Sequence, residues 1–487
     1  MKRIIYSILA IGLFIGFFNS CTEESLDPTL AQEKAIEQSV NSAEALQGVL
    51  LGAYDRLTQT AYYGRDYIVF AEVMSDNCFA NGASGRFLEP SAMDLGPGTG
   101  YVETSWRDIY EVVASTNAIL TKDKANLEGD AAAIDHIFGQ AYAIRALAHF
   151  DMLKLYGQQH VDGSDLGVPY ITTFASDLGA FGPTDFFPER QTVSEVKDNI
   201  YADLNSAIEF MSADMNDDSK QYMTTYGAQA LKSRIALYFG DWGEVVTSAE
   251  AVIGSGNYSI IAAENYVDYW ASDGGPNSIF ELAYTSTDNN NINGLAYIYR
   301  GDSYGDVEVL PNLATIFDSS DVRMTGQLTQ SNGVTVNMLG PGAWRPEQLH
   351  NNGKYPNMVN YSDNIPLIRY EEVILNYAEA LFELDQSGMN GQSALDYLNM
   401  IPNHRNAPPY AEINKDNILQ ERRRELCFEG FRFHDLARTG LDIPYPDPSL
   451  QEHGGPDYGS YNYAFPIPEE EINANKNMVQ NQGYLQQ

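Results

Sequence analysis

The feature that most constrains the fold of this chain is a run of apolar residues between positions 134 and 155 that recurs at steps of three and four. The run consists of Ile134, Ile137, Phe138, Ala141, Ile144, Ala148, Met152 and Leu155. Because an α-helix has about 3.6 residues per turn, this spacing places the apolar side chains on one face. Gly157 follows the run, and glycine is common just after a helix ends. The run therefore predicts an amphipathic helix.

Similar apolar stripes occur at 105–120, 192–211 and 227–239. After the last of these, Gly240 and Asp241 predict a turn, and a second helical stretch begins at Trp242 and stops at Gly254. Residues 370–401 repeat this construction, and both hairpins carry small residues where two helices would approach: Ala228, Ala249 and Ala251 in the first, Ala378, Ala380 and Ala394 in the second. The pattern predicts a helical solenoid of tetratricopeptide-like hairpins without a clean period.

A long segment of about 255–366 interrupts this helical pattern. It is rich in Gly, Asn, Asp, Pro and Tyr and holds only short strand-like runs, such as "SIFELAY" and "GVTVNML". Two further loop-rich stretches lie at 75–104 and 440–467. Long loops inside a compact domain usually carry function. The sequence therefore predicts a mainly α fold with a loop-rich second subdomain that carries short strands.

The N-terminus, "MKRIIYSILAIGLFIGFFNSC", has the composition of an export signal. Lys2 and Arg3 precede fifteen mostly apolar residues, which are too few to span a membrane. Cys21 follows at the place where a bacterial lipobox has its cysteine, and this resemblance implies a signal peptide over 1–20 and lipidation of Cys21. An ordinary secreted protein with a free Cys21 is the alternative. Glu23 and Glu24 are similar to a signal that sends some lipoproteins to the cell surface, so we expect a lipid-anchored, surface-exposed protein of the outer membrane.

The charge and the cysteines restrict the partners and the chemistry. The 487 residues carry a formal net charge of −37, which would repel a nucleic acid. Cys78 and Cys427 form an even pair in an oxidising compartment, so a disulfide between them is one interpretation, and a buried thiol at Cys427 is the other.

Signatures of catalysis and of metal binding are missing from the sequence. There is no HExxH, GxSxG, Walker loop or glycine-rich dinucleotide turn. His434 and Asp435 are adjacent, so on a helix their side chains point about 100° apart and do not form a catalytic pair. The segments 214–218 and 289–294 resemble calcium loops but lack the closing carboxylate. We expect no catalysis and no cofactor, with adventitious surface calcium left open.

Aromatic and amide residues gather in the long loops: Trp270, Tyr297, Tyr299, Tyr304 and Trp344, with Asn289, Asn290, Asn291, Asn293 and Arg300 among them. Sugar rings have flat C–H faces edged with hydroxyls, so proteins bind them with exposed aromatic rings flanked by amides and arginines. A single loop aromatic more often covers the core, and the cluster is better evidence than any member.

Motifs along the whole chain carry a resemblance to a known family. They include "SLDPT", "ALQGVLLGAYDRL", "SWRDIYEVVASTNAIL", "GQAYAIRALAHFDMLKLYG", "YFGDWGEVVTSAEAVIGSGNY", "IPLIRYEEVILNYAEAL", "ERRRELCFEGFRFHDLARTG" and "AFPIPEEEINANKNMVQNQGY". In this order they resemble the SusD/RagB outer-membrane lipoproteins. Cys427 departs from the alanine usual in that family, and "NMIPNHRNAPP" replaces a commoner arginine-rich version.

The resemblance implies one domain over 21–487 whose four tetratricopeptide-like hairpins support a loop-rich part. The helical scaffold would occupy about 30–255 and 366–440, the ligand-binding insertion about 255–366, and a C-terminal segment 440–487. The resemblance also implies a lid on a SusC-like TonB-dependent transporter that traps a glycan, or in some relatives a peptide. Catalysis would belong to other proteins.

Mapped by motif order, the resemblance places the ligand loops at 76–101 and 265–345. The residues expected to bind the ligand are Asn81, Arg86, Phe87, Trp270, Tyr297, Tyr299, Arg300, Tyr304 and Trp344. The expected function is non-catalytic capture of oligosaccharides or polysaccharide and delivery to the transporter. A receptor for peptide or another nutrient and a secreted glycoside hydrolase are the alternatives.

The charged stretch 421–440 is predicted to be scaffold. Glu421, Glu425 and Glu429 recur every four residues and would share one helix face, with arginines three or four positions away. This spacing predicts ion pairs that anchor other helices, and no convergent pocket.

Overall fold

The computed structural model describes residues 40–174, 187–301 and 304–484. The expected signal peptide, Cys21 and the two glutamates behind it lie outside the described residues. In the described part, no helix combines the length and the apolar composition needed to cross a membrane.

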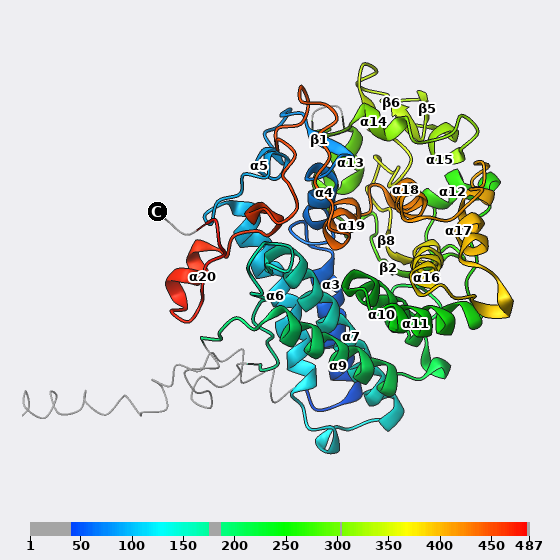
Figure 1. Ribbon diagram of the computed structural model, residues 1–487. Coiled ribbons are helices and arrows are strands. Elements are labelled where there is room, and N and C mark those ends of the chain that lie inside the picture. Colours follow the sequence, from blue (N-terminus) through cyan, green and yellow to red (C-terminus); the bar gives the residue numbers. More distant parts are fainter. Residues whose placement is uncertain (1–39, 175–186, 302–303, 485–487) are drawn as a thin grey trace, which may run out of the picture.

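Helices dominate the scaffold, as the apolar stripes predict (Figure 1). Its long helices are α3 (Ala43–Leu57), α6 (Gly100–Leu120), α7 (Ala131–Tyr156), α9 (Val193–Phe210), α10 (Thr225–Phe239), α11 (Trp242–Gly254), α16 (Tyr370–Leu384) and α17 (Ala394–Asn403). In the described part they pack as four pairs, α3 with α6, α7 with α9, α10 with α11 and α16 with α17, and each pair also contacts the next. This is a mainly α, solenoid-like arrangement.

Local sequence explains where these helices begin and end. Helix α7 starts after Asp130, whose side chain accepts a hydrogen bond from Ala133 N. Helix α9 starts with a capping box between Thr192 and Glu195. Helix α10 stops at Gly240, whose φ of 73° is a left-handed conformation that glycine adopts readily. The predicted turn between α10 and α11 is therefore confirmed.

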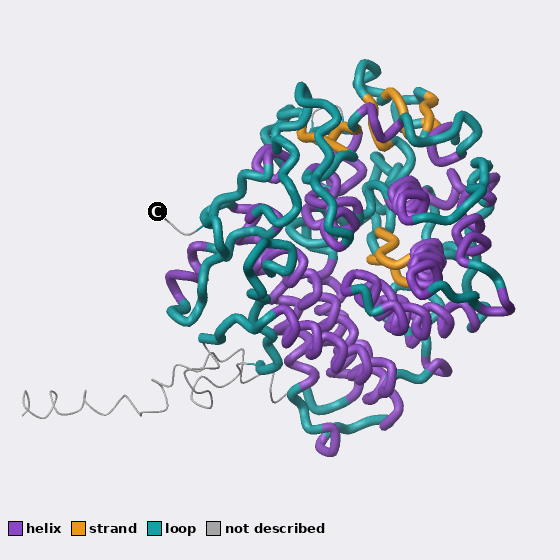
Figure 2. Tube along the Cα trace, viewed as in Figure 1, coloured by secondary structure: helices purple, strands orange, loops and turns teal. Residues whose placement is uncertain are grey.

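The remaining elements are short and lie mostly in the loop-rich upper part of the molecule (Figure 2). Before α6 come α4 (Asp66–Val73), β1 (Cys78–Ala80) and α5 (Leu88–Ala92). Between α11 and α16 lie α12 (Tyr266–Trp270), β2 (Ser278–Leu282), α13 (Leu295–Arg300), β3 (Val307–Val309), α14 (Pro311–Ala314), α15 (Val322–Thr325), β4 (Gln327–Thr329), β5 (Thr335–Asn337), β6 (Leu339–Pro341), β7 (Leu349–Asn351) and β8 (Ile365–Arg369).

Two antiparallel strand pairs fix the loop-rich part to the rest. Strand β2 pairs with β8, which leads directly into α16, so both ends of the insertion meet at the scaffold. Strand β1 pairs with β3 and joins the first loop-rich stretch to the insertion. The pairs β4–β5 and β6–β7 are local hairpins.

The charged stretch forms two helices instead of the one expected: α18 (Lys415–Leu426) and α19 (Arg432–Arg438). The chain turns between them, where Phe428 and Gly430 have φ values of 69° and 85°. Gly430 is needed because a Cβ there would lie 3.2 Å from Ile68 Cα. The prediction that Glu429 continues the helix is wrong, because the chain leaves the helical path at Cys427, whose ψ is 143°, and then turns at the two left-handed residues. Helix α20 (Glu469–Ala474) follows near the end of the described chain.

The expected anchoring role of the stretch is confirmed. Glu425 is fully buried and contacts guanidinium groups of Arg323, Arg369 and Arg405 at 2.8–3.1 Å. Glu429 pairs with Lys354 and Arg369. These partners come from the insertion, β8 and the segment after α17, so the ion network joins distant parts of the chain.

Cys78 and Cys427 are buried and free, so the disulfide interpretation is wrong.

Candidate functional site

The two predicted ligand loops meet through a network centred on Glu308. Asn81 N donates to Asp306 O at 2.9 Å, and Asn81 Nδ2 donates to Gly305 O and to Glu308 Oε1, both at 2.6 Å. Arg345 Nη1 lies 3.2 Å from the same Glu308 oxygen. The side-chain oxygen of Asn81 accepts from Ala83 N. Because both ends of its amide are used internally, Asn81 shapes the loop and has little left to offer a ligand.

Beside this network, Arg86 and three tyrosines form a half-buried surface. The Arg86 guanidinium lies 4.4 Å from the centre of the Tyr304 ring, and its Nη2 donates to Asn293 Oδ1 at 2.8 Å. Tyr297 contacts Tyr304 and Tyr361 with ring centres 5.7 and 6.2 Å apart. We name Arg86, Asn293, Tyr297, Tyr304 and Tyr361 the tyrosine ledge.

The tyrosine ledge retains capacity to bind a polar ligand. Arg86 Nη1 is buried and has no hydrogen-bond partner within the described residues. Buried donors are usually satisfied, so this unpaired guanidinium nitrogen beside the half-buried rings suits a hydroxyl or carbonyl oxygen of a ligand. Because the nitrogen is buried, the Arg86 side chain would have to shift for such a contact to form. A ring face and an adjacent planar donor are what a sugar needs for stacking and for a hydrogen bond at its edge.

A groove of about 400 Å³ lies next to the ledge. It is lined by Thr60, Ala61, Arg65, Asp66, Glu89, Thr99, Gly100, Tyr101, Thr104, Arg107 and Asp108. Arg65 connects the two surfaces, because its Nη1 lies 3.4 Å from Asn293 O and its guanidinium lies over the Phe87 ring. A hollow of this size and polarity can accept a ligand larger than one sugar.

Four of the predicted ligand residues are buried, so the structure contradicts their proposed role as exposed contacts. Phe87 and Tyr299 have no exposed surface, while Trp270 and Arg300 are 4% and 2% exposed. Phe87 stacks on Tyr101, Tyr299 contacts Tyr355 and Phe428, and Trp270 packs against Tyr269 and Tyr355.

Arg300 is a structural residue as well. Its guanidinium donates to the main-chain carbonyls of Ala296, Asn351, Lys354 and Tyr355, and burial lowers its pKa to about 10. Sequence reasoning failed here because α12 and α13 each span only one or two turns, so their inward faces leave no readable period.

The other predicted residues are half-buried, but only some meet on the ledge. Arg86, Tyr297 and Tyr304 lie together, whereas Trp344 lies in the loop between β6 and β7, next to Arg345. Tyr361 was missed, although it lies in an Asn/Ser/Asp-rich loop of the insertion like the residues that were chosen. The groove residues Arg65 and Arg107 were not among the predicted ligand residues, because no motif or spacing around them in the sequence indicates a binding site.

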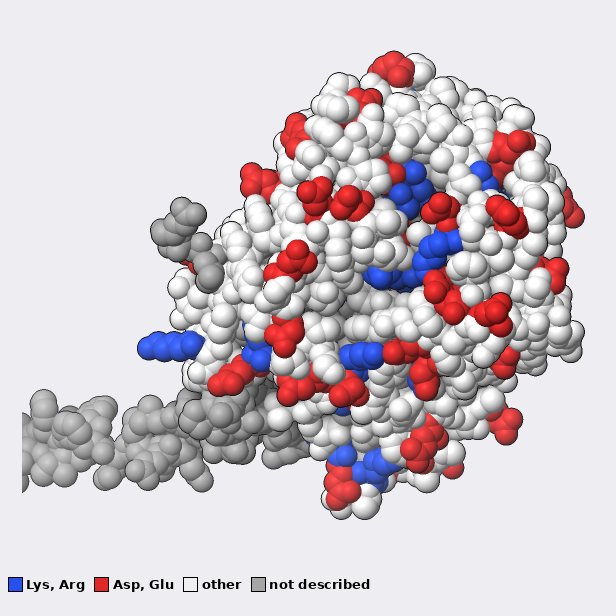
Figure 3. Space-filling model, in the orientation of Figure 1, with Lys and Arg blue, Asp and Glu red and all other residues white. Residues whose placement is uncertain are grey.

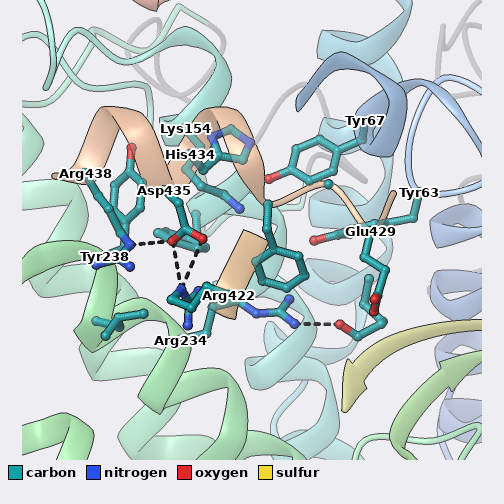
Figure 4. Close-up of a pocket in the computed structure, with 15 residues that line it drawn as sticks. Tyr63, Tyr67, Lys154, Arg234, Tyr238, Arg422, Glu429, His434, Asp435 and Arg438 are labelled. Atoms are coloured by element: carbon teal, nitrogen blue, oxygen red, sulfur yellow. Dashed lines mark hydrogen bonds and ion pairs between the residues drawn. The ribbon is translucent and has the colours of Figure 1, made fainter. Parts of the chain in front are cut away.

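A second hollow lies within the scaffold (Figure 4). Seven of its lining residues come from the charged stretch: Arg422, Glu429, Gly430, Phe431, His434, Asp435 and Arg438. The prediction that this stretch forms no convergent pocket is therefore wrong, because the turn between α18 and α19 folds its two halves toward each other. Asp435 binds Arg422 and Arg438 and has no contact with the His434 ring nitrogens, so the two adjacent residues form no catalytic pair.

Family models match both halves of the chain. A model described as "SusD family" matches residues 341–484, and one described as "Starch-binding associating with outer membrane" matches 26–237. The "SusD-like protein P2" of Formosa agariphila is 23% identical over 99% of both chains. The "Starch-binding protein SusD" of Bacteroides thetaiotaomicron is 31% identical over 143 residues, which are 28% of this chain and 25% of that protein.

Solved structures agree with this result. A SusD superfamily protein from Bacteroides thetaiotaomicron has a TM-score of 0.77 and 25% identity, covering 90% of this chain and 99% of its own. A structure from Bacteroides vulgatus described as "Putative sugar binding protein" has a TM-score of 0.76 and 25% identity, covering 92% of this chain and 100% of its own. With motifs, both family models and the fold in agreement, this chain belongs to the SusD family.

Proposed function

We propose that this protein is a non-catalytic carbohydrate-binding protein of the outer membrane, which captures oligosaccharides at the tyrosine ledge and the adjoining groove. The observation that carries the proposal is the group of half-buried rings of Tyr297, Tyr304 and Tyr361 around Arg86, next to a groove of about 400 Å³. The printed descriptions of its relatives, which name starch and sugar as ligands and the outer membrane as the location, support it.

Lipid attachment at Cys21 would hold the protein on the membrane, and a SusC-like TonB-dependent transporter would receive the captured glycan. Both follow from the resemblance to the family. Replacing Cys21 by Ser should move the protein from the membrane fraction to the soluble fraction. Purification of the native protein from its own membranes should recover the transporter, and purification without it would argue against the lid role.

The charge supports a neutral or cationic glycan over a sulfated one. Acidic side chains are scattered across the whole face in Figure 3, and the formal net charge is −37. A polyanion would approach this surface against repulsion, although Arg86 offers one local cation.

The test is binding to a panel of polysaccharides by affinity electrophoresis and calorimetry. Replacing Tyr297, Tyr304 and Tyr361 together by Ala should weaken binding of the responsive glycan at least about tenfold, since each lost stacking contact costs about 0.5–1.5 kcal/mol. Tyr461→Ala is the matched control, because Tyr461 is 44% exposed and lies outside the ledge and the groove. Equal affinities of the triple variant and the control would refute the site.

The same preparations separate the alternative functions. Binding of peptide mixtures without any response to glycans would favour a peptide receptor. Release of reducing sugar by the purified protein would indicate a glycoside hydrolase.

A further inference from the structure

The pocket in Figure 4 shares no lining residue with the tyrosine ledge or the groove. It lies among α7, α10, the turn before α4 and the α18–α19 segment, and it opens on the face where Figure 3 shows basic side chains gathered around a hollow. Its free volume is about 40 Å³. Since one water needs about 10–15 Å³ on this measure, the pocket has room for about three water-sized groups. Its occupant must therefore be very small.

Lys154 enters this pocket with too few acceptors. Its side chain is 8% exposed, and its Nζ lies 3.1 Å from Asp151 Oδ1, which is its only acceptor among the described residues. The carboxylate of Asp151 also accepts hydrogen bonds from three tyrosine hydroxyls, those of Tyr62, Tyr63 and Tyr67. An ammonium group has three N–H donors, and the other neighbours of Lys154 Nζ are aromatic rings, those of Phe150 and Tyr67, with centres 4.4 and 5.1 Å away. A ring face attracts a cation more weakly than a charged oxygen does, so this buried ammonium group would gain from an anion in the pocket.

His434, which also lines the pocket, carries a second unused polar group. The residue is 7% exposed, and its Nδ1 has no hydrogen-bond partner within the described residues. Burial, and then the charge of Lys154, hold the pKa of His434 well below its ordinary value, so the ring is neutral. A neutral imidazole has one N–H donor. Figure 4 shows His434 and Lys154 close together on one wall.

The inner surface of the pocket is more basic than acidic. Lys154, Arg234, Arg422 and Arg438 line it, against the acids Glu429 and Asp435. The carboxylates that pair with three of these cations, Asp151, Glu372 and Glu379, do not line it. Arg234 uses Nε and Nη2 for Glu372 and Leu367 O, and its Nη1 has no acceptor in the described part of the chain.

We propose that this pocket binds a small carboxylate monoanion of the size of formate or acetate. Its two oxygens would accept hydrogen bonds from Lys154 Nζ and His434 Nδ1–H, which lie on one wall, and from Arg234 Nη1, which lies across the pocket from them. Phe150, Leu237 and Phe431 also line the pocket and would cover a methyl group. A dianion is disfavoured because Glu429 and Asp435 would repel its second charge. This proposal does not depend on the proposed glycan function.

Binding would stabilise the fold. The pocket joins the helical scaffold to the turn after α18, so an occupant connects parts that are distant in the sequence. A ligand that binds only the folded protein raises its stability with ligand concentration.

The test compares sodium acetate with sodium chloride at equal ionic strength and neutral pH, with the full-length purified protein. Acetate should raise the melting temperature in a saturable manner, and calorimetry should show a single acetate site. Lys154→Met should weaken acetate binding at least about tenfold, because a charge-assisted hydrogen bond is lost. Lys124→Met is the matched control, since Lys124 pairs with Asp135 outside the pocket and is about one-third exposed.

A second variant, His434→Phe, removes the ring donor and keeps an aromatic ring against Tyr67, so it tests the site even if Lys154→Met does not fold. The triple tyrosine variant of the ledge should bind acetate as the wild type does. Equal melting temperatures in acetate and chloride would overturn the proposal. So would unchanged acetate affinity in His434→Phe, or stabilisation by phosphate as strong as that by acetate.

Discussion

Replacing Glu425 by Gln should destabilise the protein and leave glycan binding unchanged. Glu425 is fully buried and makes four contacts of 2.8–3.1 Å to guanidinium nitrogens of Arg323, Arg369 and Arg405. Glutamine keeps the volume but loses the charge, and its amide nitrogen would face donors. None of these residues lies in the ledge or the groove.

The contacts set the expected magnitude. Breaking a buried ion pair on one side costs about 3–5 kcal/mol. Each of the three arginines keeps another carboxylate, because Arg323 also binds Asp321 and Glu421, Arg369 binds Glu371 and Glu429, and Arg405 binds Glu371. We therefore expect the lower end, about 3 kcal/mol. With an unfolding entropy of about 2.1 cal/mol/K per residue over roughly 450 residues, this lowers the melting temperature by about 3 °C.

Scanning calorimetry and urea denaturation measure the effect, and glycan affinity is measured on the same preparation. Glu383→Gln is the control, because Glu383 is partly exposed and its partner Lys415 also binds Glu379. That change should cost less than about 0.5 kcal/mol. If Glu425→Gln left stability unchanged but weakened glycan binding, the assignment of the charged stretch to the scaffold would be refuted.

Two other changes test the same region. Burial raises the pKa values of Glu379 and Asp435, but the neighbouring arginines outweigh it and bring both down to about 2, below the ordinary values of 4.5 and 3.8. The two carboxylates therefore stabilise the fold above those ordinary values, and this contribution is lost as the pH falls toward 2. Urea denaturation should show lower stability at about pH 3 than at about pH 5, and the opposite trend would contradict the ion pairing. Gly430→Ala should lower the free energy of unfolding, measured by urea denaturation, by about 1–3 kcal/mol, because the φ of residue 430 is 85° and an alanine Cβ there would lie 3.2 Å from Ile68 Cα. Gly391→Ala is the control, since residue 391 has a φ of 74° but open space around it, and this change should lower stability less. Equal losses in the two variants would show that the contact with Ile68 has no effect.

Much of the scaffold could be predicted from the sequence because its signals are local. The stripe at 134–155, the Gly240–Asp241 turn and the repeated small residues predicted α7, α10, α11, α16 and α17, which the structure contains. A helix in contact with others on one face must show an apolar period of about 3.6 residues, and that period is readable without knowing the contacts.

The candidate site was less predictable, because exposure is decided by neighbours from other parts of the chain. Trp270 and Tyr304 look equally suited to a sugar in the sequence, yet Trp270 is buried against Tyr355 and Lys354. Tyr304 contacts Arg86 and Tyr297 and stays half-buried. No residue near Trp270 in the sequence indicates that contact. The same holds for Arg300, because three of its four carbonyl partners lie about fifty positions away.

The sequence by itself determined the mainly α scaffold, its helix ends and the charged stretch that anchors it, because periodicity, capping and local charge spacing act over a few residues. Only the tertiary structure decided which aromatic residues stay at the surface and that Lys154 and His434 share a pocket with unused donors. The physical reason is that burial and hydrogen-bond satisfaction are properties of groups from separate segments, and those groups meet only when the whole chain has folded.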